Sequence, residues 1–114
     1  GIMVAEAIEA AEVLASEGIS VRIVNMASIK PIDKELLIES AKKTGAVVTA
    51  EEHTVLGGLG SAVAEVLSQN GPVPMRFVGI KDKFGTSGAP EVLLKAYHLT
   101  SGDIVGAVKD VIRK

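Results

Sequence analysis

The sequence predicts an α/β layered fold with a parallel sheet, and two observations lead to this class. Segments with helical spacing of apolar residues alternate with short β-branched segments along the 114 residues. Every connection between two expected strands also contains an expected helix, which favours parallel pairing with right-handed crossovers. The expected strands cover residues 20–25, 46–50 and 75–80.

The first expected helix covers residues 3–17, because apolar residues recur there at helical spacing and glutamates lie off that stripe. The stripe consists of Val4, Ile8, Ala11 and Leu14 or Ala15. Gly18 is a natural C-terminal cap, because glycine adopts the left-handed conformation without steric cost. The strand at 20–25 follows, and it is rich in β-branched residues.

The second helix has a clear entry signal at Asp33, whose carboxylate can accept a hydrogen bond from an early backbone N–H group. Ile32 precedes this cap and can pack on Leu37 as a hydrophobic staple. Gly45 closes the helix. The second strand, at 46–50, is short and apolar.

The third helix begins in the glycine cluster Gly57–Ser61 and ends at Asn70-Gly71-Pro72. Its expected buried stripe is apolar and consists of Leu59, Val63, Val66 and Leu67. The strand at 75–80 comes next. Pro90 suits the first turn of a short fourth helix.

The last helix follows Thr100, which forms a variant of the capping box with Asp103. The apolar residues of this helix lie down one side and consist of Ile104, Val105, Val108, Val111 and Ile112. The chain contains no internal repeat, linker or low-complexity tract, so we expect residues 1–114 to form one domain.

The composition excludes several classes of function. Hydrophobic residues make up 47% and charged residues 23%, as in ordinary soluble globular proteins, and the formal net charge of −2 favours neither nucleic acid nor an anionic membrane. The absence of cysteine excludes disulfides and thiol catalysis. No apolar run approaches the roughly 20 residues that span a bilayer, and the opening residues 1–6 lack the basic region of a signal peptide. We therefore expect a cytoplasmic protein.

The stretch Glu51–Ser61 offers the best candidate site, because it follows a strand and leads into a helix. Backbone N–H groups at a helix start attract anions, and Gly57, Gly58 and Gly60 would let a ligand approach. The pattern is neither a dinucleotide fingerprint nor a P-loop. The alternative, which we prefer, is a tight turn where the helix packs close to the strand.

His53 is a candidate general base that Glu51 would orient. Neighbouring residues of an extended segment point to opposite sides, so Glu52 and His53 should not meet, whereas Glu51 and His53 could. These three residues are too few for a metal site without distant ligands. Ser61 is not embedded in G-x-S-x-G, so the sequence does not support a nucleophile elbow there. We prefer a histidine that is hydrogen-bonded at an interface, and we assign no catalytic residue.

Five segments together carry a family resemblance, namely Ile29–Asp33, Val47–His53, Gly57–Val63, Gly79–Gly88 and Leu93–Leu99. In this order and spacing they resemble the C-terminal domain of transketolases, especially the short, split type. Deoxyxylulose-phosphate synthase and the β subunit of 2-oxo-acid dehydrogenases carry a similar domain and are the alternatives. They share the Lys-Pro-x-Asp and Glu-Glu…Gly-Gly-x-Gly-Ser pieces, whereas Phe84-Gly85-x-Ser87-Gly88 looks more like transketolase.

The resemblance implies a three-layer α/β/α domain with a five-stranded mixed sheet, of which two strands would lie upstream of Gly1. One of these strands would be central. We therefore expect strands 20–25 and 46–50 to lie about two strand spacings apart, roughly 9–10 Å, or to pair with chain from outside this sequence.

The resemblance also implies a division of labour. In such enzymes, which transfer two-carbon ketol units between sugar phosphates in the pentose phosphate pathway, thiamine diphosphate and a divalent metal, Mg²⁺ or Ca²⁺, lie between two other domains. We therefore assign no catalytic, cofactor-binding or metal-binding residue to this chain. The implied partners are the remaining domains or subunit of a homodimeric enzyme. The surface to watch is formed by Glu51, His53 and the segment Gly57–Ser61.

Overall fold

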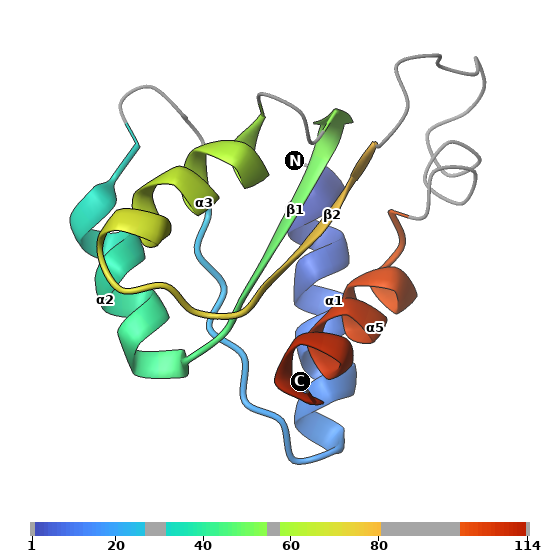
Figure 1. The fold of residues 1–114 in the computed structure, drawn as a ribbon. Coiled ribbons are helices and arrows are strands. Elements are labelled where there is room, and N and C mark those ends of the chain that lie inside the picture. Colours follow the sequence, from blue (N-terminus) through green and yellow to red (C-terminus); the bar gives the residue numbers. More distant parts are fainter. Residues whose placement is uncertain (1, 27–31, 55–57, 81–98, 114) are drawn as a thin grey trace.

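The structure is a computed structural model that describes residues 2–26, 32–54, 58–80 and 99–113 (Figure 1). The elements, in chain order, are α1 (Ile2–Ser16), α2 (Lys34–Thr44), β1 (Val47–Thr54), α3 (Leu59–Gln69), β2 (Met75–Ile80) and α5 (Ser101–Arg113). The expected helix after Pro90 lies outside the described residues. β2 has the bounds that the sequence predicts, whereas β1 extends four residues past the predicted end at residue 50.

The strands β1 and β2 form a parallel pair, which confirms the predicted direction of pairing. Val47 lies opposite Met75, the register continues to Ala50, and it then shifts before Thr54. The helices α1 and α5 contact each other and one face of the pair, while α2 and α3 lie together on the other face (Figure 1). The result is the expected three-layer α/β/α arrangement around a sheet that, within the described residues, has two strands.

The core is divided between the two faces of the sheet. One cluster joins α1, α5 and β2, and its buried members are Met3, Ala10, Val78, Leu99 and Ile104. The other cluster joins α2 and α3, and its buried members are Leu37, Ala41, Val63, Val66 and Leu67. Alternate residues of β1 supply the two clusters, since Val48 and Ala50 pack on the first and Val47 packs on the second.

The buried face of α1 differs from the predicted stripe. The fully buried residues are Met3, Ala10 and Leu14, whereas Ile8 is 47% exposed. Burial on α1 is decided by the contact with α5, which the spacing of apolar residues in α1 cannot reveal. The predicted C-terminal glycine is confirmed, because Gly18 has a φ of +80°.

The prediction of a strand at 20–25 is wrong for this structure. The segment 19–26 has no regular secondary structure, and the sheet within the described part of the chain contains β1 and β2 alone. A β-branched sequence forms a strand when a neighbouring strand supplies hydrogen-bond partners. The segment does not pair with β1, in agreement with the expected gap, but the expected separation of two strand spacings stays a prediction.

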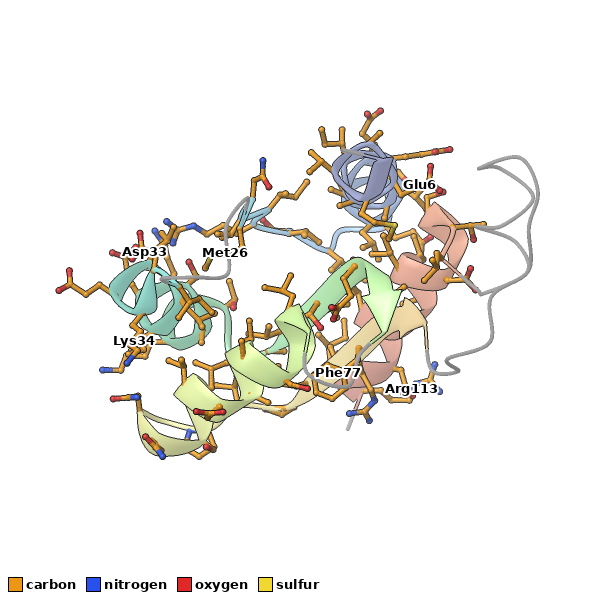
Figure 2. The ribbon with its side chains drawn as sticks, turned by 90° about the horizontal axis from the view of Figure 1, so that it is seen from above. Glu6, Met26, Asp33, Lys34, Phe77 and Arg113 are labelled. Atoms are coloured by element: carbon orange, nitrogen blue, oxygen red, sulfur yellow. The ribbon has the colours of Figure 1, made fainter. Side chains whose placement is uncertain are left out.

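The predicted caps of α2 and α5 are confirmed. Asp33 Oδ1 accepts a hydrogen bond from the Leu36 N–H group at 3.1 Å, and Gly45 has a φ of +80°. At the start of α5, Asp103 Oδ2 accepts a hydrogen bond from the Thr100 N–H group at 2.9 Å. Glu6 Oε1 of α1 also accepts a hydrogen bond from the Ser101 N–H group at 2.8 Å (Figure 2), which fixes α5 against α1.

No helix in the described ranges is both long and apolar enough to cross a lipid bilayer.

The helix α3 packs closely on the sheet at Gly60, which is buried. A Cβ atom at this position would lie 2.6 Å from Phe77 Cδ1 and 3.0 Å from Thr49 Oγ1. Phe77 is partly exposed and its ring can move, but Thr49 is buried on β1. The approach of α3 to the two strands therefore depends on glycine.

We predict that Gly60→Ala lowers the free energy of unfolding by about 1–3 kcal/mol, because an added methyl group overpacks this contact. The matched control is Gly106→Ala in α5, where a Cβ atom would meet nothing within 4 Å. In that helix interior alanine should raise the free energy of unfolding by roughly 0.5–1 kcal/mol. Urea unfolding of the wild type and of both variants measures these free energies of unfolding. Equal changes in the two variants would contradict the close packing of α3 on the sheet.

A second prediction concerns Asp110, whose Oδ2 accepts a hydrogen bond from Arg76 Nε at 2.8 Å. This hydrogen bond and the charge of Arg76 lower the pKa of Asp110 below its ordinary value of 3.8. The pair therefore stabilises the fold above pH 3.8, and its contribution is lost as the pH falls through the lowered pKa. The urea midpoints of the wild type and of Asp110→Asn should become equal as the pH falls below the lowered pKa of Asp110. A difference between the two midpoints that stays constant at all pH values would contradict the ion pair.

Candidate functional site

The candidate site lies where β1 ends and α3 begins, as the sequence predicts. The described residues of the site are Glu51 on β1, Gly58 just before α3, and Gly60 and Ser61 in its first turn. The backbone of His53 lies in β1, but its side chain is outside the described residues, and so is Gly57. The proposed contact between Glu51 and His53 therefore stays a prediction.

Glu51 is the central residue of this site. Its side chain is buried, and the residue is 7% exposed. Oε1 accepts a hydrogen bond from the Leu59 N–H group at 2.8 Å, and Oε2 accepts one from the Gly60 N–H group at 2.9 Å. The carboxylate thus binds two of the N–H groups that every helix leaves without an intrahelical partner. Its negative charge also lies at the positive end of the helix dipole.

The local sequence explains why a remote carboxylate is needed. The residue before α3 is Gly58, which has no side chain and makes no side-chain capping bond. Serine, threonine, aspartate or asparagine would normally accept these hydrogen bonds at that position. Here the register shift after Ala50 marks the point where β1 leaves the regular ladder, and Glu51 is the next residue. The cap is therefore supplied from the adjoining strand.

The geometry changes the interpretation of Glu51. From the sequence, Glu51 is expected to form part of an anion site or to orient His53. Neither expectation includes the role seen in the structure, in which Glu51 caps the start of α3. A signal was present, because a helix that starts in glycines lacks a local acceptor and a carboxylate stands at the end of the preceding strand. An anion would have to compete with this carboxylate for the N–H groups of Leu59 and Gly60.

The described residues do not fit a thiamine diphosphate site. Within the described ranges, no three histidine, cysteine, aspartate or glutamate residues come together where they could hold a metal ion. The start of α3 would be the natural place for a diphosphate, but two of its N–H groups already donate to Glu51. We therefore derive no catalytic step through the cofactor on this chain.

Comparison with known proteins identifies relatives over the whole chain. A 6-deoxy-6-sulfo-D-fructose transketolase subunit, SqwH, from Clostridium sp. (strain MSTE9) is 51% identical over 114 residues, which are 100% of this chain and 35% of the relative. A 1-deoxy-D-xylulose-5-phosphate synthase from Heliobacterium modesticaldum (strain ATCC 51547 / Ice1) is 41% identical over 112 residues, which are 97% of this chain and 17% of that enzyme. The chain thus spans about a third or less of the length of these relatives.

A solved structure and a protein family give the same result. The structure, described as a split gene transketolase in an inactive β4 tetramer, superposes with a TM-score of 0.94 at 60% identity and covers 99% of this chain and 37% of its own. The family described as "Transketolase, C-terminal domain" matches residues 1–104. The fold and the resemblance inferred from the five sequence segments are thereby confirmed, and the chain belongs to the transketolase C-terminal domain family.

Proposed function

We propose that the chain acts as the C-terminal domain of a transketolase that transfers two-carbon ketol units between sugar phosphates. Its task would be structural, in the assembly of the complete enzyme, and no complete active site would lie on it. Family membership over residues 1–104 supports the enzyme class. The observation that carries the structural role is the Glu51 carboxylate, which occupies the helix start that would otherwise suit a phosphate group.

The chemistry of the complete enzyme would then come from elsewhere. We propose that other domains hold thiamine diphosphate through Mg²⁺ or Ca²⁺, since the described part of this chain does not assemble a donor set for that metal. The cofactor would supply the stabilised carbanion that ketol transfer requires. The surface around Glu51 and the start of α3 would face a neighbouring domain or subunit.

Partners, pathway and location also belong to this proposal. We propose a homodimeric enzyme of the pentose phosphate pathway in the cytoplasm, with the remaining domains or a second subunit as the partner of residues 1–114. The β4 tetramer named in the description of the solved structure is a property of that relative. A deoxyxylulose-phosphate synthase is the alternative parent, supported by 41% identity over 112 residues.

A second candidate function is an anion-binding module that regulates the parent enzyme. The observation that favours it is a helix start with Gly58 and Gly60, because backbone N–H groups at the start of a helix attract anions. The two hydrogen bonds of Glu51 count against it. The two candidates make different predictions for ligand binding.

We predict that residues 1–114 alone show no ketol transfer and no magnesium-dependent binding of thiamine diphosphate. The reason is that the described residues form neither a metal donor set nor an open phosphate site. Isothermal titration calorimetry with Mg²⁺ and thiamine diphosphate, together with a coupled transfer assay, tests this. The control is the same assay after addition of the remaining domains, and tight cofactor binding by the chain alone would contradict the proposal.

We predict that Glu51→Ala lowers the free energy of unfolding by about 1.5–3 kcal/mol, the range for hydrogen bonds to a charged group. Glu51→Gln should lose roughly half as much, because its amide oxygen still accepts one bond. Glu12→Ala, at an exposed position of α1, is the matched control. Urea unfolding measures all three.

The same variants decide between the two candidate functions. In the wild type, millimolar phosphate or sugar phosphate should leave the amide NMR signals of Gly58, Gly60 and Ser61 unchanged, because Glu51 holds the helix start. In Glu51→Ala the same titration should shift these signals. Shifts in the wild type at millimolar ligand would favour the anion-binding module.

A further inference from the structure

The strand β2 has one edge that no described strand covers, because within the described residues it pairs with β1 alone. The Val47 N–H group of β1 donates to the Pro74 carbonyl at 3.0 Å, so this carbonyl points toward β1. Backbone groups of successive strand residues alternate in direction, and those of Met75, Phe77 and Gly79 therefore point away from β1. Such a row of N–H and C=O groups is a template on which another strand can pair.

The sequence of β2 favours pairing with a further strand. The strand has six residues, of which four are large and apolar, one is glycine and one is Arg76. Phe77 is 39% exposed. Segments of this length, with a high preference for strands and a low charge, associate readily where an edge is open. Arg76 supplies the one charge that β2 carries.

Two hydrogen bonds fix the guanidinium of Arg76 beside the open edge. Its Nη1 donates at 2.8 Å to the Met75 carbonyl, which is one of the groups that point away from β1. Its Nε donates at 2.8 Å to Oδ2 of Asp110, which belongs to α5. The arginine thus occupies an acceptor of the edge, and α5 holds it there. The side chain remains 45% exposed, so its positive charge faces the solvent along the edge.

A second exposed ion pair shows what is particular to Arg76. Lys109 Nζ of α5 lies 2.6 Å from Glu17 Oε1, which follows the end of α1. The Lys109 side chain is 40% exposed, close to the value for Arg76. Neither member of this pair lies on a strand. Both ion pairs join two elements, but only the arginine of β2 also binds a backbone group of a strand edge.

A second copy of this chain is the partner against which Arg76 would act. Two copies of β2 can pair antiparallel about a two-fold axis, because both then use the same edge. With Phe77 opposite its own counterpart, Arg76 of each copy lies opposite Val78 of the other. The two arginines are then diagonal neighbours on one face of the joined sheet, roughly 7–8 Å apart. Their like charges repel, and each loses its bond to a carbonyl that the incoming strand needs.

We propose that Arg76 protects the open edge of β2 and prevents β2 from pairing with β2 of a second copy. The arginine does so by occupying the Met75 carbonyl and by placing a positive charge where the same charge of the other copy would meet it. The bond to Asp110 keeps the guanidinium in this place. The proposal concerns the chain itself and is independent of the enzyme class.

Sedimentation equilibrium of residues 1–114 and three variants, from micromolar to millimolar concentration, tests the proposal. Arg76→Thr removes the charge and both bonds, and threonine suits a strand. Arg76→Lys keeps the charge. Lys109→Thr is the matched control, because it removes one positive charge from an exposed ion pair outside the sheet. The dissociation constant of self-association should be at least about tenfold lower in Arg76→Thr than in the wild type, because like charges no longer meet. It should stay close to the wild-type value in the other two variants.

Amide hydrogen exchange, followed by NMR, locates the contact in Arg76→Thr. The amides of Phe77 and Gly79 should exchange more slowly as the protein concentration rises, because they would bond to the second copy. Those of Val48 and Ala50, which lie on β1, should not depend on concentration.

Four outcomes would overturn the proposal. Arg76→Thr could associate no more tightly than the wild type, even if its urea midpoint falls, which would leave Arg76 a purely structural role. Lys109→Thr could associate as tightly as Arg76→Thr, or Arg76→Lys could do so although it keeps the charge. Finally, the concentration-dependent slowing could appear at Val48 and Ala50 in place of Phe77 and Gly79.

Discussion

The carboxylate of Glu51 joins the end of β1 to the start of α3, and the site depends on this one connection. Two conflicting structural requirements at the start of α3 make this contact necessary. The close approach of α3 to Thr49 and Phe77 needs glycine at position 60, and the helix begins just after Gly58. Glycines supply no local cap, so the N–H groups of the first turn must find an acceptor on another element. A buried glutamate on the adjacent strand meets both demands.

The start of α5 is organised by the same principle, with an additional local solution. Thr100 and Asp103 cap the helix from within its own sequence. Glu6 then adds a bond from α1 to the Ser101 N–H group. Carboxylates from neighbouring elements therefore hold two of the helices by their N-terminal ends, one on each face of the sheet.

Much of the fold could be predicted from the sequence, because its signals are local. The cap at Asp33, the capping box at Thr100 and the bounds of β2 depend on residues within a few positions of one another. The strand at 20–25 could not be predicted correctly, since a strand exists through its neighbour. The buried face of α1 likewise depends on α5, which lies far along the chain.

The placement of Glu51 and the glycines between β1 and α3 could be predicted from the sequence, whereas the hydrogen bonds of Glu51 could not. The end of the strand and the glycine cluster indicate where these residues lie. The hydrogen bonds of Glu51, however, join it to Leu59 and Gly60, which are eight and nine residues further along the chain. Periodicity does not reveal a side chain that bends back over such a turn. Family membership supplies the enzyme class, and the geometry supplies the role of the carboxylate.

The division of the core into two clusters has a consequence for the way the molecule unfolds. Within the described residues, one cluster belongs to α1 and α5 and the other to α2 and α3, and β1 is the element that supplies both. Helix pairs with separate cores behave as local units that open at different free energies.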